Sequence, residues 1–423
     1  FGADSAQSVA QEMGRDVTLS TIDLSAIPAL MDSVNALTLQ MKGAPQKTIA
    51  LARTHAQAYT SVFGENVPPS YIDLGNFVAL LKQSNQSDAL NQATDAVQAA
   101  IQQAVVSEKH GSDKPGATGI SIYFPNSQLY GTAEAGAQSY TAIANSFADA
   151  SLWDDFLAFH YAGRNFDANT KGLAVPAQGT ITRAPGAGNL NLSAVKQSGN
   201  VAAPGSPVVL TAKVSADSLG YIYFFTGFYD KQANSIFVAD QDYLESPQTR
   251  QVNGVYYPDW GKGNFNVQFS WEPLMYAIND GTQSVQAALM PNSYGATYQD
   301  TVYTVDGTYA FNDGTETRRA RLFFRDGQLR QVFAIDGSGS TGAMAQITPQ
   351  RGDKFTVLET WIDLDSSGKP AKTVTQDGGT LTFGDQMFKW KELDAAQGDY
   401  IVGFIAEDLD GNTQTSYGQV TVK

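Results

Sequence analysis

The feature that most constrains the fold of this 423-residue chain is a change in its hydrophobic pattern near residue 166. Before that point, apolar residues recur every three or four positions, which places them along one face of a helix. After it, aromatic and aliphatic residues alternate with polar ones, and short Asp, Asn and Gly turns separate the runs, as in antiparallel hairpins. The chain is also long for a single core. The sequence therefore predicts a helix-rich α/β part followed by all-β modules.

Residues 16–43, DVTLSTIDLSAIPALMDSVNALTLQMKG, show how the first part is built. Val17, Leu19 and Ile22 lie in a β-prone run, and Ser25 is a good residue to cap a helix. The apolar residues of that helix recur at helical spacing and are Ile27, Leu30, Met31, Val34, Leu37 and Met41. A strand followed by a helix that covers one sheet face is the basic unit of an α/β layer.

Helical spacing recurs through the rest of the first part. It predicts further helices in residues 47–64, 71–84, 87–110 and 140–163. A second strand, TGISIYFP, occupies residues 118–125. The last helix carries an aromatic-rich apolar stripe of Phe147, Trp153, Phe156, Leu157 and Tyr161.

The second part begins with a change in composition. Residues 167–206 are rich in Gly, Pro and Ala, which predicts a linker with room for one strand. From residue 207 onward the pattern predicts about fifteen short strands, enough for two small modules. We expect an α/β part at residues 1–166 and antiparallel modules of sandwich or barrel type at residues 207–295 and 296–423.

Charge and hydropathy exclude two kinds of partner. The formal net charge is −15, and residues 1–165 hold 8 basic and 15 acidic side chains, so both parts are acidic. Nucleic-acid binding needs clustered Lys and Arg, so no nucleic-acid partner is expected. The sequence has no apolar run of about 18 residues, which predicts no membrane span. Its acidic, cysteine-free composition, rich in Asn, Gln, Thr and Gly, is typical of a secreted or cell-surface protein.

The chain contains no cysteine. Disulfide bonds, thiolate metal sites and a thiol nucleophile are therefore excluded from the chain itself. An imidazole that activates a thiol needs a cysteine beside it. We therefore expect the three histidines, His55, His110 and His160, to serve in packing or on the surface rather than in catalysis.

Four motifs occur in order along the first part. They are VTLSTIDLSAI from Val17, Tyr-x-Asp-Leu from Tyr71, TGISIYFP from Thr118 and Ser-x-Trp-x-x-Phe-Leu from Ser151. In this order they resemble the clostripain-like cysteine peptidases. The resemblance implies a caspase-like fold and a hydrolase that cleaves protein or peptide substrates after basic residues.

The resemblance covers only the part of the peptidase region that follows the nucleophile. It implies that residues 1–166 supply late strands and flanking helices, with residues 16–23 and 119–124 as neighbours in the sheet. The catalytic His and Cys would come from an N-terminal peptidase segment of the same precursor, so this chain should be inactive alone. The alternative, from a different class, is a non-catalytic extracellular binding or surface-assembly protein that retains the fold.

Two acidic turns are candidate metal sites. Asp363 and Asp365 alternate in DLDSSG, and Asp408, Asp410 and Asn412 alternate in EDLDGN. Oxygen ligands at this spacing around a glycine turn are typical of a Ca²⁺ loop, although the bidentate Glu that completes such a loop is absent after the first turn. Ordinary hairpin turns favour the same residues. The sequence leaves calcium and a plain turn as alternatives, and it predicts no other cofactor.

One aromatic segment is a candidate binding surface. VYYPDWGKGNF brings Tyr256, Tyr257, Trp260 and Phe265 together with turn-forming residues. Such a cluster can stack on sugar rings or grip a peptide, whereas a strand pair that packs its aromatic residues inward has the same pattern. We expect core packing.

Overall fold

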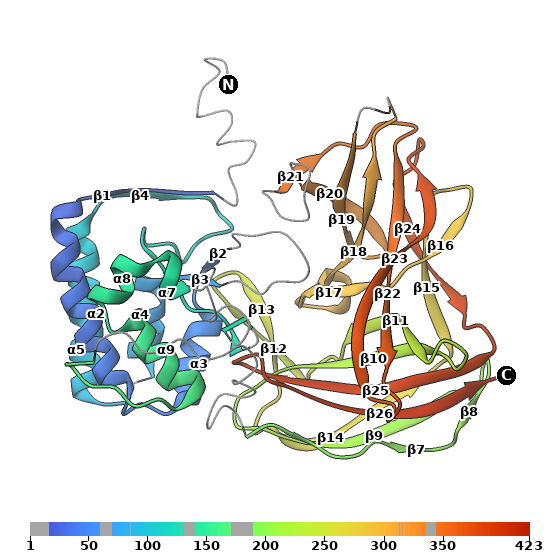
Figure 1. Cartoon of the computed structure of the whole chain (residues 1–423), viewed down its shortest axis with the longest axis horizontal. Helices are drawn as coiled ribbons and strands as arrows, with labels where there is room; N and C mark the ends of the chain where they lie inside the picture. Colours follow the sequence, from blue (N-terminus) through green and yellow to red (C-terminus); the bar gives the residue numbers. More distant parts are fainter. Residues whose placement is uncertain are drawn as a thin grey trace.

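The computed structural model of the chain describes residues 17–59, 70–84, 86–127, 129–130, 140–170, 189–312, 314, 316–335 and 344–423. Figure 1 shows two bodies side by side. We call residues 17–170 the α/β part and residues 189–423 the β part. Among the described residues, no helix is both long enough and apolar enough to cross a membrane.

Helices make up most of the α/β part. They are η1 (Leu24–Ala26), α2 (Ile27–Met41), α3 (Gln46–His55), α4 (Leu74–Gln83), α5 (Asp88–Ala104), α7 (Tyr140–Ile143), α8 (Asn145–Ala150) and α9 (Trp153–Ala162). Side-chain caps set two of the starts: Asp73 accepts from Asn76 N at 2.8 Å, and Ser87 accepts from Leu90 N at 3.2 Å. The predicted helices are present in part. The stretch 47–64 is helical only to His55 and turns into a strand at Ala58–Tyr59, while its residues 60–64 lie outside the described residues. The stretch 71–84 begins as a strand, Tyr71–Asp73, and the stretch 140–163 is divided into three helices.

The strands of the α/β part form two small sheets. They are β1 (Thr18–Ile22), β2 (Ala58–Tyr59), β3 (Tyr71–Asp73), β4 (Val105–His110) and β5 (Ser121–Tyr123). Strand β1 pairs antiparallel with β4, while β5 belongs to a separate antiparallel sheet in the order β2, β3, β5.

The expected pairing of residues 16–23 with residues 119–124 is therefore wrong. The predicted helix over residues 87–110 ends at Ala104, and its last six residues become β4 instead. The helix stops at Val105, whose backbone is extended and whose branched side chain suits a strand. Strand β4 takes the edge of β1, and Ser20 Oγ donates to Gly119 O at 2.7 Å, which joins the two runs outside any sheet.

The core of the α/β part lies between its helices and the sheet β2, β3, β5. Helix α2 packs on α5, and α9 packs on α2. Phe77, Phe124, Trp153 and Phe156 are fully buried at its centre, with ring centroids 5.3 to 6.4 Å apart. The predicted aromatic stripe of α9 therefore supplies core residues, each worth about 1.5–3 kcal/mol by burial.

Strands build the β part. In chain order they are β6 (Asn191–Leu192), β7 (Lys196–Gln197), β8 (Val201–Ala202), β9 (Val208–Ser215), β10 (Leu219–Asp230), β11 (Ser235–Tyr243), β12 (Gln248–Val252), β13 (Val255–Asp259), β14 (Asn264–Trp271), β15 (Leu274–Asn279), β16 (Ser284–Gln286), β17 (Met290–Ser293), β18 (Val302–Ala310), β19 (Thr317–Arg325), β20 (Gln328–Ile335), β21 (Met344–Ile347), β22 (Lys354–Leu364), β23 (Pro370–Thr382), β24 (Lys389–Asp394), β25 (Gly398–Asp408) and β26 (Thr413–Val422). A 3-10 turn, η3 (Tyr298–Asp300), precedes β18. Within the described residues, fifteen of the strands join one large sheet, and only the β26–β8 pair in it is parallel.

Two cores hold the β part together. The first lies between the large sheet and the small sheet of β14, β9, β6 and β7, and it draws on residues 190–275 and 395–422. The second draws on residues 278–388. Because β25 and β26 return to the first core, the cores do not coincide with the expected modules 207–295 and 296–423. Residues 191–202, expected in the linker, pair with β9 and β26.

Candidate functional site

The turn between β25 and β26 reaches from the β part into the α/β part. We call residues 408–412 the interface loop. Its main chain is bound by three residues of the α/β part: Ser127 N donates to Asp410 O at 2.8 Å, Thr54 Oγ1 to Leu409 O at 2.9 Å, and Arg53 Nη1 to Leu409 O at 3.4 Å. Gly411 has a φ of 81°, and a side chain there would come within 2.6 Å of Asn126. The loop is thus shaped for this contact.

A buried histidine meets a buried aspartate at the same contact. His160 Nε2 lies 3.0 Å from Asp410 Oδ1, and both side chains are 1% exposed. The rings of Phe124, Phe156 and Tyr161 surround the imidazole. His160 therefore joins the two parts of the molecule, and this packing role agrees with the expectation from the sequence.

The oxygens of the interface loop are already engaged in hydrogen bonds. Asp408 Oδ1 accepts from Asp410 N at 3.0 Å and from Asn412 N at 2.9 Å, and Asp408 Oδ2 accepts from Asn412 Nδ2 at 2.9 Å. Asp410 Oδ1 faces His160. The Asn412 amide thus donates to Asp408, and the carboxylates do not converge on one point as Ca²⁺ ligands do.

The other predicted calcium turn lies at the end of β22. Asp363 Oδ1 accepts from Ser235 Oγ at 3.0 Å, whereas Asp365 Oδ1 accepts from Ser367 N at 2.7 Å and from Lys369 N at 3.0 Å. Among the described residues, no group of three or more His, Asp or Glu side chains is arranged to hold a metal ion. Calcium binding at either turn stays a prediction from the sequence.

Burial raises the pKa of two carboxyl groups, one in the interface loop and one directly before it. Burial raises the pKa of Glu407 to about 7, although Tyr223 Oη donates to its Oε2 at 3.1 Å. Burial also raises the pKa of Asp408 to about 6, and the charge of Asp410 adds to this shift. The contact between the two parts therefore holds acidic groups that favour their protonated forms.

The hairpin β12–β13 makes a second contact with the α/β part. Asn253 Nδ2 donates to His55 O at 2.8 Å, and Tyr257 Oη donates to Thr54 O at 2.9 Å. The Tyr257 ring packs on the His55 imidazole at 4.6 Å. Burial, with a contribution from the Arg250 charge, lowers the pKa of His55 to about 4. His55 is therefore a neutral packing residue.

The remaining residues named by the sequence take structural positions. His110 Nδ1 pairs with Glu108 Oε1 at 2.8 Å on β4. Trp260 stacks on Phe265 at 5.4 Å, and both pack against the first core of the β part. The expected core packing is confirmed for this pair.

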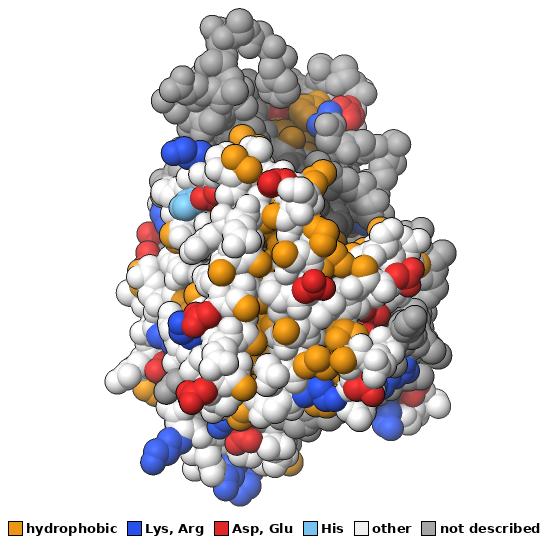
Figure 2. Space-filling view, turned by 90° about the vertical axis from the view of Figure 1, so that its left-hand side faces the viewer, with side chains coloured by type: hydrophobic (Ala, Val, Ile, Leu, Met, Phe, Trp, Pro, Cys, Tyr) orange, Lys and Arg blue, Asp and Glu red, His pale blue; other side chains and the backbone are white. Residues whose placement is uncertain are grey.

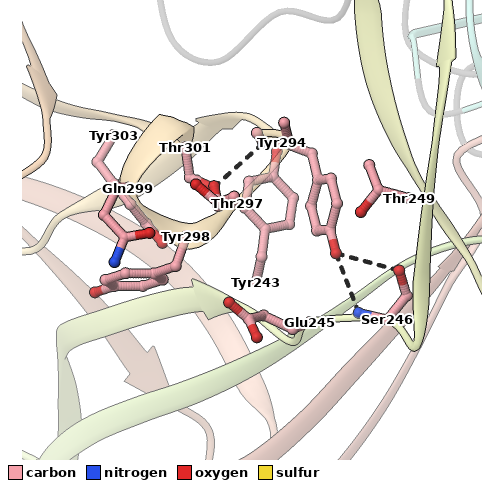
Figure 3. Close-up of a pocket in the computed structure, with 12 residues that line it drawn as sticks. Tyr243, Glu245, Ser246, Thr249, Tyr294, Thr297, Tyr298, Gln299, Thr301 and Tyr303 are labelled. Atoms are coloured by element: carbon pink, nitrogen blue, oxygen red, sulfur yellow. Dashed lines mark hydrogen bonds between the residues drawn. The ribbon is translucent and has the colours of Figure 1, made fainter.

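A pocket opens in the β part between the end of β11 and the turn η3 (Figure 3). Its volume is about 310 Å³. Figure 3 shows four tyrosines around Glu245, with hydroxyl and amide groups completing the wall. The residues that line it are Tyr243, Glu245, Ser246, Thr249, Tyr294, Gly295, Ala296, Thr297, Tyr298, Gln299, Thr301 and Tyr303.

The sequence did not identify this pocket. Apart from Thr249 on β12, its residues come from two segments about 50 positions apart, DYLES at 242–246 and SYGATYQDTVY at 293–303. The second segment holds three tyrosines and the first places Tyr243 two positions before Glu245, which is the signal that sequence inspection offered. Only the packing of β17 against β11 and β18 brings them together.

Comparison with known proteins places the first part of the chain in a family. Residues 3–160 match the clostripain family. No curated protein matches the chain. Among solved structures, dimeric latent PorU from Porphyromonas gingivalis shares 11% sequence identity, with a TM-score of 0.11, over 55% of this chain and 34% of that one.

The family match covers residues 3–160, so it applies to the α/β part and not to the β part. Over these residues the chain is similar to the clostripain family, as the four motifs indicated. An extension of antiparallel β modules follows this region. The fold class predicted from the sequence is confirmed.

Proposed function

We propose that the chain is the C-terminal portion of a clostripain-like cysteine endopeptidase that cleaves after basic residues. The match of residues 3–160 to the clostripain family carries the proposal. A cysteine peptidase acts through a thiolate that a histidine activates, and this chain has no cysteine. The nucleophile and its histidine then belong to an N-terminal peptidase segment of the same precursor.

The surface of the α/β part supports such a partner. Leu19, Leu24 and Val106 are exposed by 73%, 77% and 68% at the end of the molecule formed by β1, η1 and β4. Figure 2, which shows the left-hand side of the molecule in Figure 1, has hydrophobic side chains across the middle of this face, with charged side chains among and around them. Large apolar side chains exposed to water favour association. The occupant that fits the proposal is the peptidase segment that carries the missing strands.

Complementation tests the proposal. The chain alone should not hydrolyse Arg or Lys amide substrates, because it lacks the thiol. Mixed with the segment encoded upstream of it, the chain should restore hydrolysis that a thiol-alkylating inhibitor abolishes. Leu19→Lys combined with Val106→Lys should weaken this complementation, whereas Leu393→Lys, at an exposed leucine of the β part, should not. Inhibitor-resistant hydrolysis by the chain alone would overturn the proposal.

The runner-up function is that of a non-catalytic extracellular binding or surface-assembly protein. The tyrosine-lined pocket in the β part favours it, because a binding protein needs a site of its own. The upstream coding sequence separates the two functions: a His and an Asp-x-Cys motif there support the peptidase, and their absence supports the binding protein. For either function we propose a secreted or cell-surface location, which fractionation of producing cells tests.

A further inference from the structure

We propose that the tyrosine-lined pocket of the β part binds an organic cation, a guanidinium or primary ammonium group, between Glu245 and the rings of Tyr243, Tyr294 and Tyr298. This inference does not rest on the proposed function, because the pocket lies wholly within the β part. It rests on the shape of the pocket, the charge of its walls and the aromatic faces around it.

The shape limits the ligand to a small group. A volume of about 310 Å³ is near the lower end of the range of ligand pockets, which is roughly 300–1,000 Å³. One long side chain or a small molecule fits such a space, whereas an extended polymer does not. In Figure 3 the Glu245 carboxylate points into the space between Tyr298 and the pair Tyr243 and Tyr294.

The walls hold their shape without a ligand. Ser246 N donates to Tyr294 Oη at 3.1 Å, and the Tyr243 and Tyr294 rings meet edge to face at 5.3 Å. On the other side, Gly295 N donates to Thr301 Oγ1 at 3.2 Å, which closes the turn that carries Tyr298. A preformed pocket loses little conformational entropy when it binds.

Glu245 makes the charge of the pocket negative. Among the residues that the structure describes, the lining includes no Lys, Arg or His. Behind the wall, Tyr303 Oη donates to Asp242, and Asp240 is buried beside it. Within the described part of the chain, Asp240, Asp242 and Glu245 form no ion pair with a basic side chain. Burial holds the pKa of Asp240 well above its usual range and raises the pKa of Asp242 to about 6, so the exposed Glu245 is the charged group that a cation meets in this pocket.

The aromatic faces select an organic cation rather than a bare metal ion. A guanidinium or ammonium group is attracted to the face of a tyrosine within about 6 Å of the ring centre. A guanidinium also stacks on such a ring and forms two parallel hydrogen bonds with a carboxylate such as Glu245. A neutral sugar would leave the Glu245 carboxylate without a counter-charge. The guanidinium is therefore the preferred group.

Isothermal titration of the full chain with matched ligands tests the proposal. N-acetylarginine amide should bind, and N-acetylcitrulline amide, which has nearly the same shape without the charge, should bind at least about tenfold more weakly. Added salt should weaken the binding of arginine amide, because Glu245 is exposed. Two further ligands distinguish the sources of the cation. Tighter binding of spermidine would assign the cation to a free polyamine, and tighter binding of a tripeptide with a central arginine would assign it to a polypeptide.

Variants connect the binding to the named residues. Glu245→Gln keeps the shape and removes the charge, and we expect a loss of about tenfold in affinity for arginine amide. Tyr298→Ala should weaken binding by several-fold, while Tyr298→Phe, which keeps the ring face, should retain most of it. Asp385→Asn, at an exposed carboxylate outside the pocket, serves as the control. Circular dichroism checks that each variant folds.

Three results would overturn the proposal. They are equal affinity for the arginine and citrulline amides, unchanged affinity in Glu245→Gln, and saturable binding of a neutral sugar such as N-acetylglucosamine in place of arginine. An absence of saturable binding by every cationic ligand would do the same. Neither proteolytic activity nor its absence bears on these measurements, so failure here is distinct from failure of the peptidase proposal.

Discussion

The strands of the β part and those of the α/β part differ in how many neighbours they pair with. In the β part, long strands such as β10, β22 and β25 pair on both edges within one large sheet. In the α/β part the described strands form sheets of only two and three members, and a lone pair of strands is marginally stable in water. The comparison teaches that the β part has a sheet of its own to build on, whereas the α/β part depends on its helices and on contacts with neighbours.

The largest effect is expected from truncating a core residue of one part, because this should lower the stability of that part and leave the other unchanged. Trp153 is fully buried in the α/β part, and its Nε1 donates to Tyr123 O at 2.6 Å. Trp153→Ala should cost about 3–5 kcal/mol of unfolding free energy, because it opens a cavity and leaves that carbonyl without its donor. Differential scanning calorimetry should show the transition of the α/β part at a much lower temperature, with that of the β part in place.

The matched control for this variant lies in the other part. Trp361 packs against the first core of the β part, so Trp361→Ala should lower the transition of the β part instead. If either variant shifts one common transition of the whole chain, the two parts unfold as a unit and the proposed contrast in their stability is wrong.

The next effect concerns the contact between the parts. Asp410→Ala removes the acceptor that faces His160 Nε2. A buried polar group that loses its partner costs about 1–3 kcal/mol, and we expect the two unfolding transitions to move apart in urea. Asp410→Asn retains an acceptor oxygen and should preserve most of the coupling. Equal behaviour of the two variants would show that the hydrogen bond does not join the parts.

A third prediction uses the pH dependence of the same contact. The pKa of Glu407 is raised from 4.5 to about 7. The folded state therefore holds this proton more tightly than the unfolded state, and stability falls as pH rises from about 4.5 through about 7. Glu407→Gln should stabilise the chain by about 3 kcal/mol near pH 8 and have little effect near pH 4. A pH-independent difference between the two proteins in chemical denaturation would contradict this assignment.

The smallest effect tests calcium at the two acidic turns. The two candidate sites are the turn with Asp363 and Asp365 and the turn with Asp408, Asp410 and Asn412. If either turn holds Ca²⁺, removing the ion leaves carboxylates of like charge close together. A chelator should then lower the melting temperature of the chain. Asp408→Asn should abolish this sensitivity if the interface loop is responsible, and Asp365→Asn if the other turn is. Unchanged melting with chelator would leave both turns as ordinary hairpin connections.

Local patterns predicted most of the helices because their signals lie within a few residues. The helical spacing over residues 26–42 is sufficient to place α2, and the cap at Asp73 marks the start of α4. The strand β4 was missed because Val105 to His110 continues a helical sequence without a Pro or Gly to end it. Its strand conformation is set by pairing with β1, which lies more than 80 residues earlier.

The candidate sites show the same difference between what local sequence patterns predict and what packing of distant segments decides. Asp410 and His160 were each singled out in the sequence, but 250 residues separate them, and no local pattern indicates that they meet. The pocket combines two segments about 50 positions apart in the same way. Sequence patterns report on side chains that are neighbours along a helix or a strand, whereas these contacts depend on how whole elements pack.

By itself, the sequence determined the order of an α/β part and an all-β part, the clostripain-like motifs of the first, and the absence of a thiol nucleophile from the chain. Hydrophobic period and residue identity are enough for these, because each is a local property. The tertiary structure alone decided which strands pair, that the EDLDGN turn enters the α/β part, and that four tyrosines surround Glu245. These outcomes follow from burial and hydrogen bonding between segments far apart in the chain, where the pairing that satisfies most backbone groups and buries most apolar surface prevails.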